Sequence, residues 1–177
     1  MKPLFTVHPG EWLVGSEIEH RFRHLHVWLP AKDTGIDLLL TNTDNSRSVS
    51  LQVKLSQDYV VTHHPELDLR FIGWSTLKRR KIETSKAQYW VLVLLGFGNR
   101  TRDFIIIPPK LLATRLAAIH GEKEQTYFTV NRHGQCFDRR GLKQAEDGQI
   151  VAGTYRNEER DFSAWLNNWA PIEALNG

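Results

Sequence analysis

The sequence predicts a mixed α/β fold, with a central mixed β-sheet flanked by helices, in a chain of 177 residues. Three observations lead to this prediction. Short runs rich in Val, Ile and Leu alternate with segments whose apolar residues recur at helical spacing. The composition, 41% hydrophobic and 24% charged, is typical of a globular protein. No repeat, low-complexity tract or linker interrupts the chain, so we expect a single domain over residues 1–177.

The N-terminal part is predicted to form a helix followed by a strand pair. The helix covers residues 11–28 and ends before Pro30, because proline cannot continue a helix. Its apolar positions recur every three or four residues: Val14, Ile18, Phe22, Leu25 and Leu29. Strands are predicted at 36–41 and 49–56; the second alternates apolar with polar residues. The loop between them is rich in Asn, Asp and Ser, which fits a hairpin.

The middle of the chain is predicted to hold a short helix and two further strands. We assign no element to residues 57–70 as a whole, although 69–74 fit a strand. Residues 76–83 are predicted to form a basic helix. The runs 89–95 and 104–107 are apolar without polar alternation, which is typical of strands covered on both faces.

The C-terminal part adds a helix over about 108–120, which begins at a proline pair and ends at a glycine. A hairpin follows at 127–137, and a last helix is predicted at about 158–169, with aromatic residues spaced to pack inward. We therefore expect a core of about residues 11–120 and a C-terminal hairpin-plus-helix extension, about residues 121–177, packed on it.

Several features argue against a membrane or secreted protein. The longest apolar run, residues 89–95, is far shorter than the roughly 20 residues that span a bilayer. The N-terminus lacks the sustained apolar region of a secretory signal. Cys136 is the sole cysteine, so no internal disulfide can form. We expect a cytoplasmic protein with no membrane contact.

The formal charge of +3 is unevenly distributed. Residues 70–115 carry ten basic and two acidic residues, a charge of +8, which leaves −5 for the rest of the chain. This asymmetry is expected of a protein that meets a polyanion on one face. Charge alone fits a solvated helix face at residues 78–81 equally well.

Three polar residues on the predicted hairpin indicate a chemical site. Gln52 and Lys54 are two apart, so their side chains leave the same face of a strand, and the hairpin partner brings Asp37 near that face. The backbone carbonyl of Val53 lies between them. Carboxylate, amide and carbonyl oxygens suit a hard cation such as Mg²⁺. Lys54 could then orient water or offset charge that develops on a phosphate. Taken singly, each residue is explained as well by a turn, an edge or a solvated position.

This pattern resembles the PD-(D/E)xK nuclease superfamily, the fold of many restriction endonucleases and Holliday junction resolvases. The resemblance covers about residues 11–119 and implies a restriction endonuclease-like core. In that family an Asp at the start of one strand and an acid-x-Lys on the next bind one or two Mg²⁺ ions. Asp37, Gln52 and Lys54 match these positions.

The family also places an acidic residue on the first helix. Glu17 and Glu19 both flank the apolar stripe, and we prefer Glu17, which lies slightly nearer to it. The resemblance therefore implies Asp37, Gln52, Glu17 and the carbonyl of Val53 as metal ligands. Lys54 is then the catalytic amine.

Two departures from the family pattern leave alternatives open. Glycine and isoleucine precede Asp37 where the motif has proline, which is a minor difference. Gln52 replaces an acid, so metal affinity should fall. We expect a Mg²⁺- or Mn²⁺-dependent nuclease that hydrolyses phosphodiester bonds in DNA rather than RNA. The alternatives are a catalytically inactive nuclease-like module that binds nucleic acid or protein, and an unrelated fold with an accidental motif.

The predicted basic helix gains a role in this interpretation. Its four consecutive basic residues surround the helix, so only some of them can face nucleic acid: Lys78, Arg79, Arg80 and Lys81. We expect two of them to contact phosphates in the groove that leads to Asp37, without reading the base sequence. Family members that cut both strands often act as dimers, which makes a homodimer a further expectation.

Overall fold

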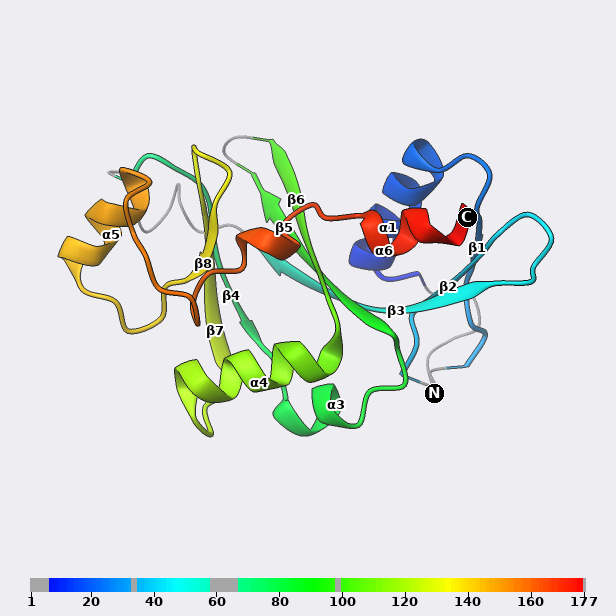
Figure 1. The fold of residues 1–177 in the computed structure, drawn as a ribbon, viewed down its shortest axis with the longest axis horizontal. Coiled ribbons are helices and arrows are strands. Elements are labelled where there is room, and N and C mark those ends of the chain that lie inside the picture. Colours follow the sequence, from blue (N-terminus) through cyan, green and yellow to red (C-terminus); the bar gives the residue numbers. More distant parts are fainter. Residues whose placement is uncertain (1–6, 33–34, 58–66, 98–99, 177) are drawn as a thin grey trace.

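The fold consists of two β-sheets packed face to face with helices outside them. The structure is a computed structural model that describes residues 7–32, 35–57, 67–97 and 100–176. Figure 1 shows the five-stranded sheet between α1 and α6 on one side and the three-stranded sheet on the other. The prediction of a mixed α/β fold with a central mixed sheet flanked by helices is confirmed. No helix within these described ranges is long and apolar enough to cross a membrane.

The larger sheet, sheet A, is mixed and has the strand order β1-β2-β3-β5-β6. β3 and β5 are parallel, and the other neighbours are antiparallel. Its strands are β1 (His26–Trp28), β2 (Leu38–Thr41), β3 (Ser48–Gln57), β5 (Tyr89–Gly96) and β6 (Thr101–Ile107). The predicted hairpin and both predicted apolar strands are confirmed.

The smaller sheet, sheet B, is antiparallel and has the order β4-β7-β8. Its strands are β4 (Leu69–Thr76), β7 (Gln125–Asn131) and β8 (Cys136–Asp138). β4 begins within the segment that the sequence left unassigned, of which residues 58–66 lie outside the described residues. α5 (Gln144–Val151), which the sequence did not predict, packs on the outer face of sheet B through Ile150. With one buried residue, α5 has no apolar residues recurring at helical spacing by which the sequence could have predicted it.

Alternate residues of β5 belong to two separate hydrophobic clusters, and the apolar residues of β3 belong to the first of them, which fixes the two faces of sheet A. Val53 packs with α1 (Pro9–Arg21) and with Ile172 of α6 (Ala170–Glu173). The opposite face, with Trp90, packs against α3 (Arg79–Glu83), α4 (Pro109–His120) and sheet B. The side chains of Gln52 and Lys54 therefore leave sheet A on the face away from α1.

Of the predicted helices, one is too long and one is wrong. The N-terminal helix ends at Arg21, and its expected last turns form the edge strand β1, which pairs with β2. The apolar spacing continued into this strand by chance, and Val27 and Trp28 are residues that favour strands. The expected helix at 158–169 consists of turns, two isolated bridges at Asp161 and Leu166, and a 3₁₀ turn at Ser163–Trp165.

The C-terminal part shares its core with the rest of the chain. Phe128, Val130 and Phe162 are fully buried and pack in one cluster with Trp90 and Ile105 of sheet A. The expected extension, about residues 121–177, therefore supplies strands and core residues rather than an outer layer.

Candidate functional site

Asp37 is held at the point where β2 begins to pair with β3. Its backbone N–H donates to the carbonyl of Leu51 over 2.8 Å, just before the first β2–β3 pair, Leu38 with Leu51. Its carboxylate then turns back to β3. Oδ2 of Asp37 accepts a hydrogen bond from the backbone N–H of Val53 over 2.7 Å and another from Nε2 of Gln52.

We call the place where Asp37 meets Gln52 and the backbone of Val53 the notch, and the carbonyl of Val53 also belongs to it. The N–H and C=O groups of one strand residue point to the same side of the strand. Because the N–H of Val53 reaches Asp37 beyond the last β2–β3 pair, its carbonyl also points to the edge that β2 leaves uncovered. The structure thus brings together Asp37, Gln52 and the backbone of Val53, as the spacing predicted.

Lys54 lies on the same face as Gln52 and next to a buried aromatic ring. Its Nζ is 5.7 Å from the ring centroid of Trp90, which is within the range of a cation–π interaction. Trp90 is the register partner of Gln52 on β5, and its indole N–H donates to Ser85 Oγ over 2.9 Å. The sequence did not reveal this role of Trp90, because a Trp in an apolar strand indicates only a core residue.

The helix acid is not brought to this notch. Glu17 lies on α1, the helix that packs on the other face of sheet A, and its carboxylate is occupied by two arginines. Oε1 lies 2.6 Å from Arg21 Nε, and Oε2 lies 3.7 Å from Arg102 Nη2. Glu19 is exposed on the same helix. Gly10, at the start of α1, lies against Val53 and Leu55 of β3, about two turns before Glu17.

The basic helix is shorter than predicted and one of its four cations has a structural role. α3 covers Arg79–Glu83, with Lys78 at its N-cap. Arg79 is half-buried and donates from Nη2 to the carbonyl of Gly121 over 3.0 Å, at the end of α4. The other three basic residues are exposed: Lys78, Arg80 and Lys81.

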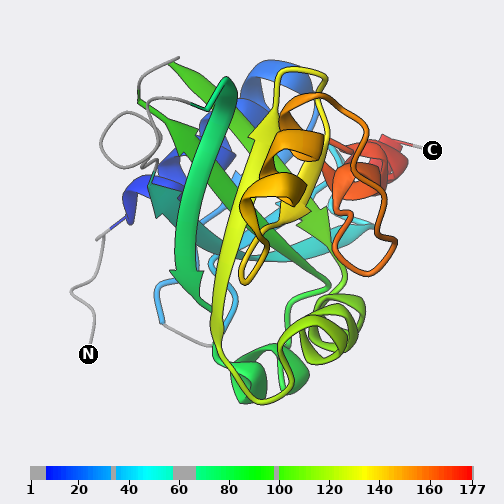
Figure 2. The same cartoon turned by 90° about the vertical axis from the view of Figure 1, so that its left-hand side faces the viewer.

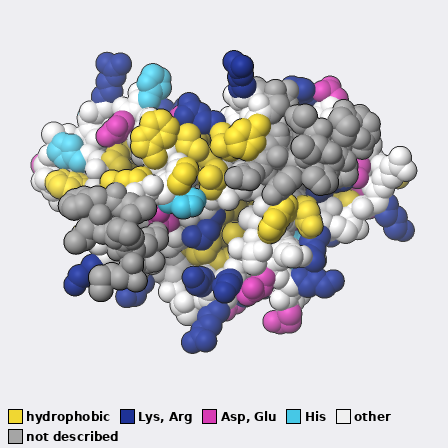
Figure 3. Space-filling view, turned by 180° about the vertical axis from the view of Figure 1, so that it is seen from behind, with side chains coloured by type: hydrophobic (Ala, Val, Ile, Leu, Met, Phe, Trp, Pro, Cys, Tyr) yellow, Lys and Arg dark blue, Asp and Glu magenta, His cyan; other side chains and the backbone are white. Residues whose placement is uncertain are grey.

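The loop after α3 connects the basic helix to the site. Ser85, just beyond α3, binds the indole of Trp90 beneath Lys54. Gln88 is tied to the start of β3, where its Oε1 accepts from the N–H of Ser50 over 2.9 Å. Figure 3 shows dark-blue side chains gathered at the lower edge of the molecule, the end at which Figure 1 places α3. Ile82 of α3 packs in the same cluster as Trp90, so the exposed cations of α3 lie on the side of sheet A that carries Lys54.

The donor set fits a weakly held hard cation. Mg²⁺ binds oxygen ligands, keeps several waters and needs only one or two carboxylates from the protein. Asp37 supplies one carboxylate, Val53 a carbonyl, and Gln52 an amide oxygen if its amide group turns over. Within the described ranges no group of three or more His, Cys, Asp and Glu side chains is placed to hold a metal.

Comparison of the chain with protein-family models, with curated proteins and with solved structures gives no match.

Proposed function

We propose that this protein is a Mg²⁺- or Mn²⁺-dependent nuclease that hydrolyses phosphodiester bonds, with DNA as its substrate. The observation that carries the proposal is the arrangement at the start of β2. There the carboxylate of Asp37 meets the amide of Gln52 and the backbone of Val53, and Lys54 leaves the same face of β3. The resemblance to PD-(D/E)xK nucleases in these positions supports the same reaction.

Each residue has a role in this proposal. Asp37, the Val53 carbonyl and, with its amide turned over, the Gln52 side-chain oxygen would hold the cation, which when bound would polarise the phosphate and favour ionisation of water. Lys54 offsets the negative charge that develops on the phosphate as water attacks phosphorus, the bond from phosphorus to one sugar oxygen breaks, and that oxygen leaves as a hydroxyl with a proton from solvent. Trp90 positions the ammonium of Lys54 from below. The exposed cations of α3 contribute attraction to the nucleic-acid backbone, independent of base sequence.

The second candidate function is a nuclease-like module that binds nucleic acid without cutting it. Gln52 is its main support, because its amide donates to Asp37 and brings no second negative charge to the notch. The arginine pairs of Glu17 favour the same function, since they engage the acid that the family would add. This module would keep the basic surface of α3.

Cleavage assays with plasmid and single-stranded DNA separate the two functions. We expect Mg²⁺- or Mn²⁺-dependent cutting that falls at least about a hundredfold in Asp37→Ala and in Lys54→Ala, the scale seen when one transition-state contact is removed. Asp44→Ala in the β2–β3 loop and the exposed Lys123→Ala are charge-matched controls that should cut normally.

Two outcomes would contradict this proposal. Metal-dependent cutting that survives both Asp37→Ala and Lys54→Ala would exclude this site as its source. DNA binding without any cutting, together with no Mn²⁺ binding at millimolar concentration in calorimetry, would favour the interaction module.

A further inference from the structure

The segment between α3 and β5, residues 84–88, carries two exposed polar side chains next to the candidate site, and we call it the α3–β5 loop. Lys86 and Gln88 are exposed, whereas Ala87 between them is 3% exposed and anchors the loop. The loop contains no acidic residue. It therefore presents an ammonium group and an amide, without a carboxylate between them.

Hydrogen bonds fix the loop at both ends. Ser85 Oγ accepts the backbone N–H of Ala87 over 3.2 Å and the indole N–H of Trp90 over 2.9 Å. At the other end, the backbone N–H of Gln88 donates to the carbonyl of Ser50 on β3 over 3.0 Å. Because the backbone is fixed before any ligand binds, little conformational entropy remains to be lost on binding.

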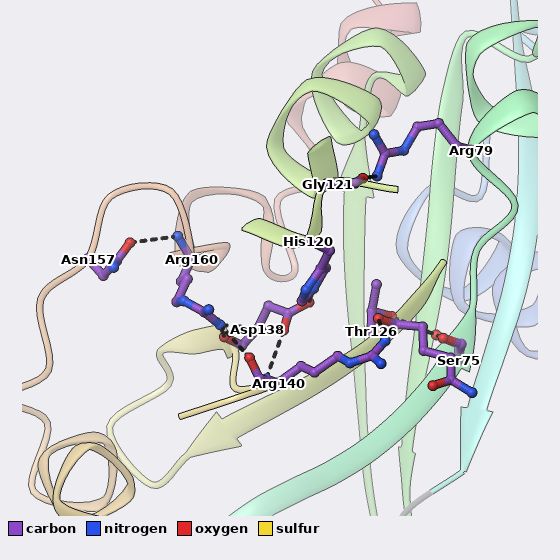
Figure 4. A network of polar contacts seen from close by, with 10 residues as sticks. Ser75, Arg79, His120, Gly121, Thr126, Asp138, Arg140, Asn157 and Arg160 are labelled. Atoms are coloured by element: carbon purple, nitrogen blue, oxygen red, sulfur yellow. Dashed lines mark hydrogen bonds and ion pairs between the residues drawn. The ribbon is translucent and has the colours of Figure 1, made fainter. Parts of the chain in front are cut away.

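The helix that precedes the loop is also fixed. Figure 4 shows Arg79 of α3 reaching the carbonyl of Gly121 at the end of α4, a hydrogen bond of 3.0 Å. In Figure 2, α3 (green) and α4 (yellow-green) lie side by side at the lower end of the molecule. Ile82 of α3 is fully buried in the cluster that contains Trp90. The loop thus joins two elements that are both held in place.

The side chain of Gln88 uses one end of its amide and leaves the other end unused. Its Oε1 accepts the backbone N–H of Ser50 over 2.9 Å and lies 3.4 Å from the Ser50 hydroxyl. The amide nitrogen lies on the other branch of the planar group and can donate two hydrogen bonds. In the part of the chain that the structure describes, Nε2 of Gln88 donates to no acceptor.

The amide of Gln88 lies in line with the notch and with Lys54. Ser50, Gln52 and Lys54 occupy every second position of β3, so all three side chains leave the same face, at intervals of about 7 Å. Gln88 lies beside Ser50, and Asp37 lies beside Gln52. A nucleic-acid strand along this face would meet Gln88 first, then the notch, then Lys54.

We infer that the α3–β5 loop binds the phosphate next to the one that is cleaved, Gln88 through Nε2 and Lys86 through its ammonium group. This inference rests on the proposed nuclease function and adds two substrate-binding residues to it. Amide and ammonium groups are common donors to the phosphate oxygens of nucleic acids. Neither group reads a base, so the loop sets the position of the strand over Asp37 without regard to sequence.

Fluorescence anisotropy with a labelled 20-nucleotide oligothymidylate, in EDTA, tests the loop without any need for cleavage. Gln88→Glu keeps an oxygen for the N–H of Ser50 and replaces the donating NH₂ with a charged oxygen. We expect it to weaken binding by about tenfold to a hundredfold, the scale of one lost hydrogen bond to a charged group. Lys86→Ala should weaken binding and make the salt dependence shallower by about one unit of slope.

Two exposed residues outside this face provide matched controls. Gln149→Glu on α5 makes the same change of charge, and Lys123→Ala removes the same cation; both should bind within twofold of the wild type. The loop is contradicted if Gln88→Glu binds as Gln149→Glu does, or if the wild-type chain does not bind the strand. If Gln88→Glu fails to fold, Lys86→Ala decides, because its side chain is exposed: wild-type affinity and salt slope would contradict the loop.

A single neutral linkage separates a phosphate contact from a structural role of Gln88. In a methylphosphonate, a methyl group replaces one charged oxygen of the phosphate. We would place one such linkage at each position around the main cleavage point in turn and measure kcat/KM. At one linkage beside the cleavage point, wild type and Gln88→Glu should differ less than twofold, and elsewhere by about tenfold or more. An equal loss at every linkage would contradict the contact.

The outcomes for the loop and for the nuclease are distinguishable. A chain that binds the strand through Gln88 and Lys86 but never cuts keeps the loop as a phosphate-binding element and contradicts the nuclease. A chain that cuts through Asp37, while binding and cleavage are insensitive to Gln88 and Lys86, contradicts the loop and keeps the nuclease.

Discussion

At the scale of single residues, Asp37 shows how one carboxylate can be satisfied before any ligand binds. The N–H groups of Val53 and Gln52 both donate to Oδ2. A buried or half-buried acceptor without such donors would carry a desolvation cost of about 1–3 kcal/mol. Gln52 therefore stabilises the notch in the absence of metal, where a second acid would repel Asp37.

Gln52→Glu should exchange stability for metal affinity. Without metal, the new carboxylate would meet Asp37 within hydrogen-bond distance, so we expect a lower melting temperature in EDTA. With Mn²⁺ the added charge should raise affinity by about tenfold or more, roughly 1.4 kcal/mol, and restore the melting temperature. Calorimetric titration and thermal unfolding measure the two effects. Gln149→Glu on exposed α5 is the control; equal behaviour of both variants would contradict the site.

Cys136 gives a pH dependence that is separate from the site. Its thiol is fully buried, and burial, together with nearby Asp103 and Asp138, raises its pKa well above the ordinary value. Above about pH 8.5 the unfolded chain loses this proton while the folded chain keeps it. The unfolded state then binds fewer protons, so the free energy of unfolding should fall as pH rises.

Urea unfolding between about pH 8 and 9.5 checks this prediction. The fall in stability should be shallower in Cys136→Ala, which has no thiol to ionise. A thiol reagent should react with the native wild-type protein far more slowly than with the protein in denaturant, because the thiolate is the reactive form. Equal reaction rates in both conditions would contradict the burial of Cys136.

The residues of the hairpin could be predicted and the helix acid could not, for a physical reason. Gln52 and Lys54 share a face because strand periodicity is local, and a hairpin brings Asp37 beside them within the same short segment. The position of Glu17 depends on where α1 crosses sheet A, which is decided by tertiary packing and not by the local sequence. Its arginine partner Arg102 lies 85 residues later in the chain, beyond the reach of any local pattern.

At the scale of secondary structure, the helix predicted at 158–169 is wrong because local hydrogen bonds compete with helical periodicity there. The segment before Trp165 has aromatic residues at helical spacing, yet Asp161 Oδ1 accepts from the N–H of Ser163 over 2.8 Å. Such side-chain bonds favour turns over helices. Asn167, with a φ of 53°, then takes the left-handed conformation and ends any helical path. By contrast, α4 has a proline at its start and a glycine at its end, and it was predicted well.

The two arginines at the start of α3 should separate a structural role from a binding role. Arg79 caps the end of α4 through the Gly121 carbonyl, so Arg79→Ala should lower the free energy of unfolding by about 1 kcal/mol. Arg80 is exposed, so Arg80→Ala should leave stability within about 0.5 kcal/mol of the wild type.

For DNA affinity we expect the opposite order: Arg80→Ala should lower it more than Arg79→Ala. Arg80→Ala is expected to weaken binding to all sequences alike and to make the salt dependence shallower by about one unit of slope. Urea unfolding and anisotropy titrations over a range of salt concentrations measure the two effects. Wild-type affinity and salt slope in Arg80→Ala would contradict a phosphate contact at this position.

At the scale of the whole molecule, Asp103 joins both sheets and the C-terminal segment. It is 1% exposed on β6, and its carboxylate binds Arg70 Nη2 of β4 at 2.9 and 3.0 Å. Asn167 donates to Asp103 Oδ1 over 2.8 Å and also accepts from the N–H of Phe104. One buried carboxylate thus links elements that are distant in the sequence.

Asp103→Ala should therefore be strongly destabilising. Removing this buried carboxylate takes away its hydrogen bonds to Arg70, whose side chain is 28% exposed, and to Asn167, at a cost of about 1.5–3 kcal/mol. The exposed pair of Asp68 and Arg132 provides the control, with side chains 71% and 46% exposed, and Asp68→Ala should cost less than about 1 kcal/mol. Urea unfolding measures both, and similar losses in the two variants would contradict the central role of Asp103.

The parallel pairing of β3 with β5 has a consequence for how the protein is made. Ser50 and Gln88, which tie these strands together, are 38 residues apart. During synthesis the hairpin that carries Asp37 emerges first, and one edge of β3 then stays open until β5 follows. Non-local strand pairs form slowly, and β4 and α3 are synthesised between β3 and β5. One edge of β3 therefore stays without a partner strand while these two elements are synthesised. Lys54 gains its support on Trp90 only after that edge has closed.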